Sequence, residues 1–394
     1  MFRVVIDKPA AKTFADVMAS NKGHTTGFDY LRIFLATGVV LQHSFILAQQ
    51  DYPIFPGQML VLMTMILPAF FALSGFLVAG SLLRNSIPQF VALRALRIFP
   101  ALIVEIFLCA FVLGVFFTTL PLRSYFADPM FYRYLLNALG IIHLYLPGVF
   151  DGRVINAQLT TIPIELECYF ALVLVGLFRL VQWRWLLLAL ISIACIGMTI
   201  IAFNYPIIAE ARTLSGRVLV SAFGFGTLIY YFRDRLPFHL ALFIVCLFMS
   251  YILLSHSKLS YMASPFVAYA TVYIGMQKFR PIPFGDLSYG LYLFHFPVAQ
   301  TIVVLTGSIL SWGELFLMTT LVTGGFAACS WYLIEKPMLS SKSIVLAYIA
   351  RIMPASMSNS LILHPRETTN IRKGSQHQER RPDSGTGVPV LKST

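Results

Sequence analysis

Long apolar stretches separated by short polar segments dominate this chain from residue 28 to residue 334. Most are about 20 residues long, which is the length that a helix needs to cross a bilayer. We therefore predict an all-α polytopic membrane protein with about ten transmembrane helices in one bundle. The predicted spans are 28–48, 60–83, 99–119, 159–181, 185–203, 214–232, 237–254, 259–277, 286–306 and 314–334.

The polar segments predict the orientation and the domain limits. The mixed segment 121–158 is predicted to be an exterior loop with a partly inserted or re-entrant helix around its apolar run, 135–147. With ten spans and both termini inside, the interior loops carry nine Lys and Arg residues and the exterior loops six, as the positive-inside rule favours. The predicted parts are a cytoplasmic N-terminal segment (1–27), a transmembrane domain (28–338) and a basic, largely disordered cytoplasmic tail (339–394).

Composition excludes several classes of protein. The 394 residues are 58% hydrophobic and 12% charged, whereas a soluble domain is about 25% charged. The net charge of +12 is explained by basic cytoplasmic loops, so we predict no nucleic-acid partner. The five cysteines lie in apolar stretches without metal-ligand spacing, and we predict no metal site. The chain has no Walker loop, no H-E-x-x-H and no G-x-G-x-x-G motif, which argues against ATP-driven pumps, zinc proteases and nucleotide-dependent redox enzymes.

Two ionisable residues, Arg32 and His43, lie eleven positions apart inside the first apolar stretch. On a helix they share one face and are separated by about 16 Å along the axis. An ionisable residue inside a membrane span is costly and is a functional-site hypothesis by default. We therefore predict a site that is reached from the cytoplasm and works inside the membrane.

The fourth span begins with two carboxylates, Glu165 and Glu167. They point about 200° apart on a helix, so only one of them can face the interior of the bundle. Glu165 shares a face with Tyr169, at i,i+4, and is our choice for the inward residue. The alternative is that either carboxylate simply reaches the outer interface.

The ninth span carries a polar stripe, in which Ser288, Tyr292 and His295 recur at i, i+4 and i+7. We predict that this stripe lines a cavity, although a packed structural histidine would give the same pattern. Arg94 and Arg97 are predicted to lie in the inner loop before the third span. At i,i+3 two guanidinium groups can face one phosphate-bearing ligand, or they can be ordinary positive-inside residues.

Five segments, in order along the chain, resemble the acyltransferase-3 family of integral-membrane O-acyltransferases. They are Phe28-Asp29-Tyr30-Leu31-Arg32 with His43, the run 70–77, Arg94-x-x-Arg97-x-x-Pro100, the run 287–297 and Ile334-Glu335-Lys336-Pro337. The resemblance covers about residues 25–338 and marks Glu165 rather than Glu167. One position departs from the family pattern, because Thr160 stands where the family usually has Trp.

The resemblance implies a membrane enzyme, mostly bacterial, that acylates a glycan. The expected reaction moves an acyl group, most simply acetyl, from cytoplasmic acetyl-CoA to a hydroxyl of a cell-surface or exported glycan such as an exopolysaccharide, O-antigen or lipo-oligosaccharide. The expected partners are acyl-CoA, a glycan or lipid-linked glycan acceptor and membrane lipids, with no permanently bound cofactor. The expected location is the inner membrane, with both termini cytoplasmic.

The resemblance also suggests roles for the candidate residues. Arg32, Arg94 and Arg97 would bind the phosphates of CoA. His43 would act as a general base or carry the acyl group itself, and Glu165 would stabilise the acceptor side. The predicted cavity residues are Tyr169, Ser288, Tyr292 and His295. Glu335 is interpreted as an ordinary charged helix end without a chemical role.

Two other classes of protein remain open at this point. His and Glu at mid-bilayer also suit a proton-coupled transporter or flippase of lipid-linked sugars. Transporters of that kind usually have paired interrupted helices in two matching halves, which this sequence lacks. A membrane scaffold, in which the polar residues only bind neighbouring helices, is the third interpretation.

Overall fold

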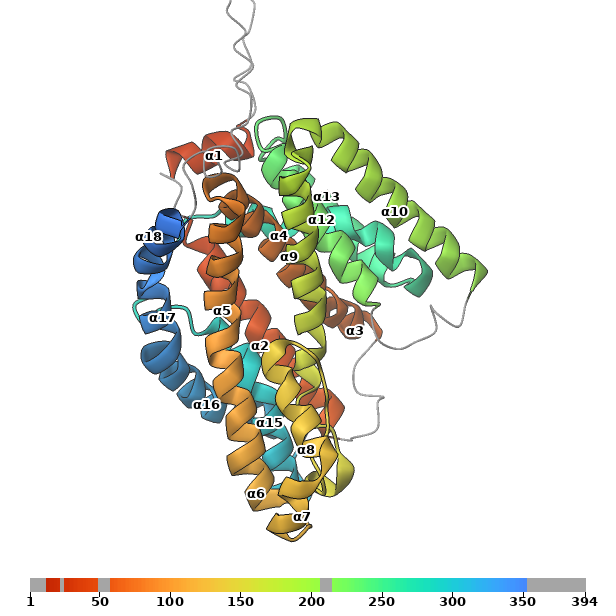
Figure 1. Cartoon of the computed structure of the whole chain (residues 1–394). Coiled ribbons are helices and arrows are strands. Elements are labelled where there is room, and N and C mark those ends of the chain that lie inside the picture. Colours follow the sequence, from red (N-terminus) through yellow and green to blue (C-terminus); the bar gives the residue numbers. More distant parts are fainter. Residues whose placement is uncertain (1–11, 22–24, 49–56, 206–214, 353–394) are drawn as a thin grey trace, which may run out of the picture. The chain divides into compact units, whose positions relative to one another are not determined.

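A computed structural model describes residues 12–21, 25–48, 57–205 and 215–352, and these fold into helices with no β-strand among them (Figure 1). All of them belong to the first of two contact-defined units, Met1–His364. The predicted tail is described only as far as residue 352, where it is helical. Its predicted disorder lies outside the described residues.

Each predicted span coincides with one or two helices. These are α2 (Gly27–Leu47), α3 (Gly57–Thr64), α4 (Ile66–Arg84), α5 (Ile87–Phe107), α9 (Thr161–Leu177), α10 (Arg184–Asn204), α12 (Gly216–Tyr231), α13 (Leu240–Leu254), α14 (Ser264–Gly275), α15 (Ser288–Leu305) and α16 (Trp312–Ser330). The shorter helices are α1 (Phe14–Ser20), α6 (Gly114–Phe117), α7 (Leu122–Ala127), α8 (Pro129–Leu135), α17 (Lys336–Ser340) and α18 (Lys342–Ile352).

Seven helical stretches of the described residues are long and apolar enough to cross a membrane, so the protein is a multi-pass membrane protein. They are Gly27–Leu47, Met59–Arg84, Ile87–Phe117, Ala157–Leu177, Leu180–Asn204, Ser288–Leu305 and Trp312–Ile352. The helices α12, α13 and α14, with 16, 15 and 12 residues, are shorter. The count of about ten spans therefore stays a prediction.

The third span begins earlier than predicted, because helix α5 starts at Ile87 rather than at residue 99. Ser86 and Gln89 form a capping box at its start, which satisfies backbone N–H groups that the helix leaves unpaired. Pro100 lies inside the helix without ending it. The prediction of an inner loop holding Arg94 and Arg97 is therefore wrong, since both arginines lie within α5.

The prediction of a helix across 135–147 is also wrong. After α8 a short 3-10 turn, Leu136–Leu139, ends at Gly140, whose φ of +82° favours glycine. The Asn137 side chain then binds the His143 backbone, accepting from its N–H at 2.6 Å and donating to its carbonyl at 2.8 Å. These local bonds satisfy the backbone without a helix.

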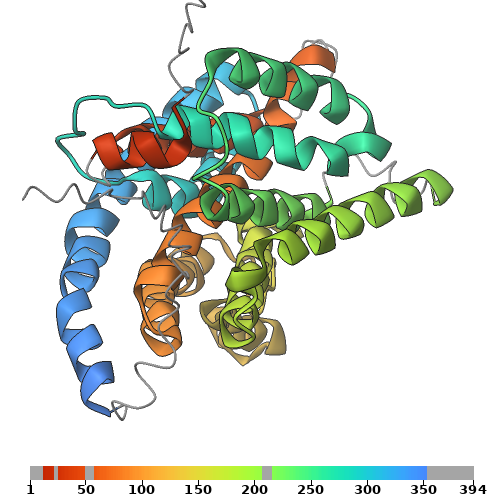
Figure 2. The same ribbon diagram turned by 90° about the horizontal axis from the view of Figure 1, so that it is seen from above.

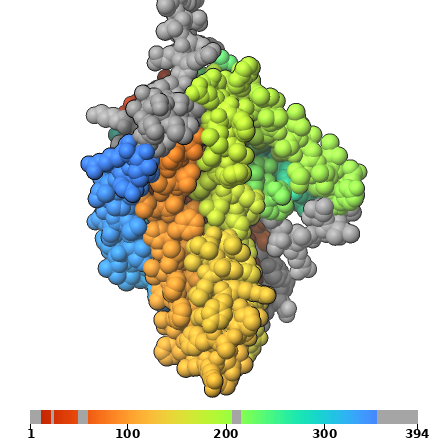
Figure 3. All heavy atoms as spheres, viewed as in Figure 1, coloured from red at the N-terminus to blue at the C-terminus, as the bar shows by residue number. Residues whose placement is uncertain are grey.

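Helix α15 has the largest buried share of the seven stretches, and it lies against α2 and α16. Figure 3 shows α16 to α18 (blue), α5 (orange) and α9 beside one another on one face of the described chain. Helix α10 extends away from the other helices in Figure 2 and exposes apolar side chains such as Ile193 and Ile200. Such a surface suits contact with lipid.

Two glycines let α4 and α12 approach closely. A Cβ atom at Gly75 would lie 2.1 Å from the Phe223 carbonyl oxygen, and one at Gly226 would lie 2.0 Å from the Ala72 carbonyl oxygen. The Thr227 hydroxyl donates to the Gly75 carbonyl across this contact, at 3.2 Å. Small residues and an interhelical hydrogen bond are typical of helix pairs in membranes.

We predict that Gly75→Ala destabilises the protein by about 1–3 kcal/mol, because the added methyl group meets backbone rather than a movable side chain. The measurement is the melting temperature of the purified protein in detergent. Gly325→Ala is the matched control, since a Cβ there meets nothing within 4 Å. Equal melting temperatures for the two variants would contradict the close packing of α4 on α12.

Candidate functional site

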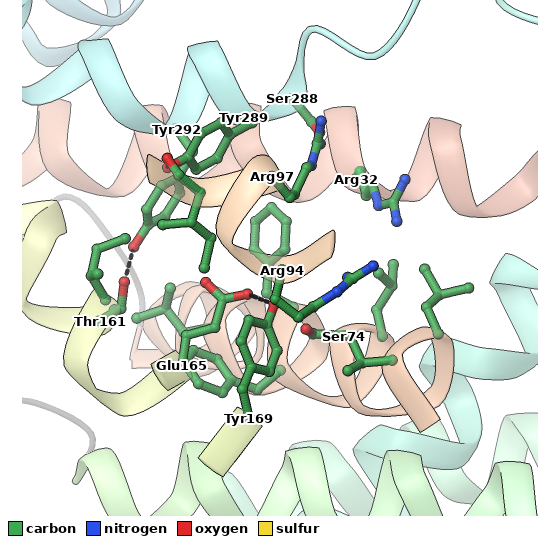
Figure 4. A pocket seen from close by; sticks show the side chains of 18 residues that line it. Arg32, Ser74, Arg94, Arg97, Thr161, Glu165, Tyr169, Ser288, Tyr289 and Tyr292 are labelled. Atoms are coloured by element: carbon green, nitrogen blue, oxygen red, sulfur yellow. Dashed lines mark hydrogen bonds between the residues drawn. The ribbon is translucent and has the colours of Figure 1, made fainter. Parts of the chain in front are cut away.

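A pocket lies among helices α2, α4, α5, α9 and α15 (Figure 4). Its polar lining is Arg32, Ser74, Arg94, Arg97, Thr161, Glu165, Tyr169, Ser288, Tyr289 and Tyr292. Seven of the nine residues singled out in the sequence are in this lining, although they come from four different helices. The two that are not in it are His43 and His295.

Acidic groups neutralise two of the three arginines. Arg97 donates to Asp286 at 2.7 Å and to Glu335 at 3.2 Å. Asp286 also lies 3.4 Å from Arg32. The Arg97 guanidinium is further held over the ring of Tyr289, whose hydroxyl donates to the Ile98 carbonyl of α5.

The Asp286 carboxylate is the common partner in this group. It precedes α15 and accepts hydrogen bonds from the Ser288 hydroxyl and from the Ser288 backbone N–H, which adds the favourable interaction of an anion with a helix N-terminus. Burial alone would raise the pKa of Asp286, but Arg97, Arg32 and these bonds together lower it. The carboxylate therefore stays ionised and holds both guanidinium groups.

Arg94 differs from the other two arginines. Among the described residues no ion pair or hydrogen bond joins its guanidinium to the protein, and its buried Nε atom has no hydrogen-bond partner. Arg94 interacts electrostatically with Glu165. The Glu165 carboxylate also accepts a hydrogen bond from the Tyr169 hydroxyl. Arg94 is thus the guanidinium that an incoming anion can bind without displacing a carboxylate.

The level of the arginines differs from the prediction. Arg94 and Arg97 follow the start of α5 by seven and ten residues, which is about 10 and 15 Å along the helix. They therefore reach the level of Glu165 instead of lying in a surface loop. Glu165, which we expected to stabilise the acceptor side, lies in the same pocket as the arginines.

Tyr292 separates this pocket from the two histidines. Its hydroxyl lies 2.5 Å from the Thr161 hydroxyl and donates to the Gln158 carbonyl at 3.0 Å, and its ring meets that of Phe70 edge to face. Its backbone carbonyl oxygen lies 2.7 Å from Nδ1 of His295. The same residue therefore contacts the pocket with its side chain and the histidines with its backbone.

His43 and His295 form a hydrogen-bonded pair between α2 and α15. Nδ1 of His43 lies 2.8 Å from Nε2 of His295. His295 is fully buried, whereas His43 is partly exposed and meets the Phe296 ring edge to face. The prediction that His295 lines the same cavity as Ser288 and Tyr292 is wrong, because its ring faces His43.

A second buried polar group lies on α5 away from the pocket. Glu105 is fully buried and accepts hydrogen bonds from Asn156 and from the Cys109 thiol, while Asn156 accepts from the Tyr134 hydroxyl at 2.8 Å. These bonds attach the segment before α9 to α5. They fix the position of the start of α9, the helix that carries Thr161 and Glu165.

Sequence reasoning missed three acidic residues. Glu105 had a usable signal, because it is an ionisable residue within an apolar span. Asp286 stands two residues before Ser288, a typical place for a residue that caps a helix. Glu335 was interpreted as an ordinary helix end, which is wrong, since it is 3% exposed and ion-paired to Arg97.

Comparisons with known proteins give matches that cover most of this chain. A family model described as an acyltransferase domain matches residues 25–335. Nodulation protein 10 of Rhizobium leguminosarum bv. viciae is 27% identical over 366 residues, which is 83% of this chain and 96% of that protein. An O-acetyl transferase of Shigella phage Sf6 is 27% identical over 338 residues, 80% of this chain and 96% of that protein. No solved structure matches significantly.

The fold is that of a multi-pass membrane protein with a polar pocket among its helices. The chain belongs to the acyltransferase-3 family and is an acyltransferase.

We predict that Glu335→Ala destabilises the protein by about 1.5–3 kcal/mol, because it removes one of the two carboxylate partners of Arg97 while Asp286 remains. The melting temperature in detergent measures the effect. Glu167→Ala is the matched control, since Glu167 is exposed. A loss no larger than that of the control would show that the Arg97–Glu335 pair does not support the fold.

Proposed function

We propose that the protein is a membrane O-acetyltransferase that moves an acetyl group from cytoplasmic acetyl-CoA to a hydroxyl of a cell-surface or exported glycan. The observation that supports it best is the pocket of three arginines, together with the hydrogen-bonded pair of histidines that lies further along α2 and α15. Of the two relatives, one carries the name O-acetyl transferase and the other that of a nodulation protein. The glycan acceptor, which is exported or lipid-linked, is the class that the family resemblance suggests.

The proposed donor site is the arginine pocket. Arg94 binds a phosphate or another anionic group of CoA, since it is the guanidinium without a carboxylate partner among the described residues. Arg32 and Arg97 add positive charge that Asp286 and Glu335 partly compensate. The acyl-bearing arm then extends along α2, where about 16 Å separates Arg32 from His43.

The proposed chemistry takes place at His43. Its unprotonated nitrogen removes the proton from the acceptor hydroxyl while the oxygen attacks the thioester carbonyl. The C–S bond breaks, and the protonated His43 returns the proton to the CoA thiolate. If His43 instead carries the acetyl group, the same nitrogen attacks the thioester first, the C–S bond breaks and CoA leaves as the thiolate. The acceptor hydroxyl then attacks the acyl-imidazole, which restores the free nitrogen, and the hydroxyl proton neutralises the thiolate.

The orientation of the helices supports donor entry from one side. Arg32 of α2 approaches Asp286, which precedes α15, and further along the same two helices His43 contacts His295. Helices α2 and α15 therefore run in the same direction, as the first and ninth of ten alternating spans would. In this proposal the arginine pocket opens toward the cytoplasm, both termini are cytoplasmic and the membrane is the inner membrane. The second candidate, a flippase of lipid-linked sugars, has weaker support, because the chain belongs to a family of acyltransferases.

We predict that Arg94→Met raises the KM for acetyl-CoA about 10- to 100-fold, because a charge-assisted hydrogen bond to the donor is lost. The measurement is transfer of radiolabelled acetyl from acetyl-CoA to the glycan fraction of membranes that contain the variant. Arg84→Met is the matched control, since Arg84 is exposed at the end of α4. An unchanged KM for Arg94→Met would remove Arg94 from the donor site.

We predict that deletion of the gene and His43→Ala both remove one acetyl mass from surface glycans of the source cell, while the glycans are still made and exported. Mass spectrometry of those glycans checks this, with exposed His256→Ala as the control that keeps the acetyl mass. Loss of the whole glycan from the surface would favour the flippase. An acetyl mass that persists in His43→Ala would exclude His43 from the chemistry.

A further inference from the structure

The hydrogen bonds around the two histidines determine which nitrogen of each ring carries a hydrogen. Nδ1 of His295 lies 2.7 Å from the Tyr292 carbonyl oxygen, which can only accept, so this nitrogen must donate. Both rings lie among apolar and aromatic groups, and no acidic side chain of the described residues pairs with either. A buried cation without a partner is costly, so His295 is neutral and its Nε2 is an acceptor.

The direction of the bond between the rings follows. Since Nε2 of His295 accepts, Nδ1 of His43, 2.8 Å away, must be the donor. The His43 ring also interacts with the backbone of Val39, one turn earlier on α2. Nε2 of His43 is then left without a hydrogen and holds a free lone pair.

We infer that His295 is a positioning residue, which holds His43 in the tautomer whose Nε2 can accept a proton or attack a thioester. This inference rests on the proposed function and deepens it. His295 is fully buried behind His43, so it does not touch a substrate. When His43 takes the acceptor proton at Nε2, its Nδ1–H bond to His295 becomes charge-assisted and therefore stronger. The same lone pair is needed if His43 carries the acetyl group.

Tyr292 links this pair to the donor pocket. The carbonyl that fixes His295 belongs to the residue whose hydroxyl binds Thr161 and Gln158 at the pocket wall. The orientation of the two rings therefore depends on α15 keeping its contact with the segment before α9. This explains why the tyrosine and the histidine follow each other at i,i+3 on one helix.

The test compares His295→Leu with His295→Gln in the full-length protein. Glutamine can accept from His43 with its oxygen and donate to the Tyr292 carbonyl with its nitrogen, whereas leucine can do neither. With radiolabelled acetyl-CoA and the glycan fraction of membranes from the deletion strain, we expect His295→Leu to lower kcat about 100-fold or more. We expect the KM for acetyl-CoA to change less than about twofold, since His295 does not line the donor pocket. His295→Gln should restore most of the rate.

A second measurement does not depend on activity or on folding of a single variant. Diethyl pyrocarbonate acylates histidine nitrogens that carry a free lone pair. Peptide mass spectrometry of the wild-type protein at neutral pH should show rapid modification of His43 and none of His295 before unfolding. The reaction of His43 should be slower in His295→Leu than in His295→Gln, with exposed His256 as the internal reference.

Each outcome bears on one of the two proposals. If the wild-type protein transfers no label, or His43→Ala transfers as much as wild type, the proposed function fails. If wild type is active, His43→Ala is inactive and His295→Leu keeps its full rate, the function holds and the inference about His295 fails. Equal losses in the leucine and glutamine variants, or a protected His43 in the modification experiment, would also overturn it.

Discussion

Compensation of buried charge is the constraint on which this structure depends. Asp286 and Glu335 together hold Arg97, and Asp286 also approaches Arg32. The charges therefore bring together α2, α5, the start of α15 and the segment Trp331–Glu335 that follows α16. In a medium without water an uncompensated guanidinium is very costly, which makes these contacts interdependent. The same compensation stops short of Arg94. Among the described residues, the pocket therefore has one guanidinium without a carboxylate partner and two whose main partners are carboxylates of the protein itself.

Two polar centres lie one after the other along α2 and α15. The arginines and Glu165 occupy one, and the histidine pair occupies the other, with Tyr292 between them. Because both helices run in the same direction, Arg32 of α2 meets Asp286 at the start of α15, and His43 meets His295 further along the two helices. The hydrogen bond from Asn156 to Glu105 attaches the segment before α9 to α5. That segment also carries Gln158, whose carbonyl accepts the hydrogen bond of the Tyr292 hydroxyl.

The sequence was informative where a polar residue interrupts an apolar stretch. Arg32, His43, Glu165 and the stripe on α15 could be found in that way, and their helices are confirmed. What could not be predicted is which residues meet across helices, because periodicity reports the face of one helix and not its neighbour. Asp286 and Glu335 look like ordinary helix ends until Arg97 is placed beside them. The start of α5 was missed because the sequence shows that two arginines in a span are costly. It does not show that the carboxylates of Asp286 and Glu335 lie close enough to offset the charge of Arg97.

The distance between the two centres has a chemical consequence for the proposed function. A base that accepts a proton becomes a cation, and neighbouring guanidinium groups repel a cation. Arg32 and His43 share a face of α2 but lie about 16 Å apart, which reduces that repulsion in proportion to the distance, and Asp286 compensates the charge of Arg32. A charged donor can then be bound where positive charge is concentrated, while its thioester reaches a neutral histidine further along the helix. In this proposal the hydrogen bond from His43 to His295 takes the place of the carboxylate that orients the histidine of a catalytic triad, without adding a second buried charge.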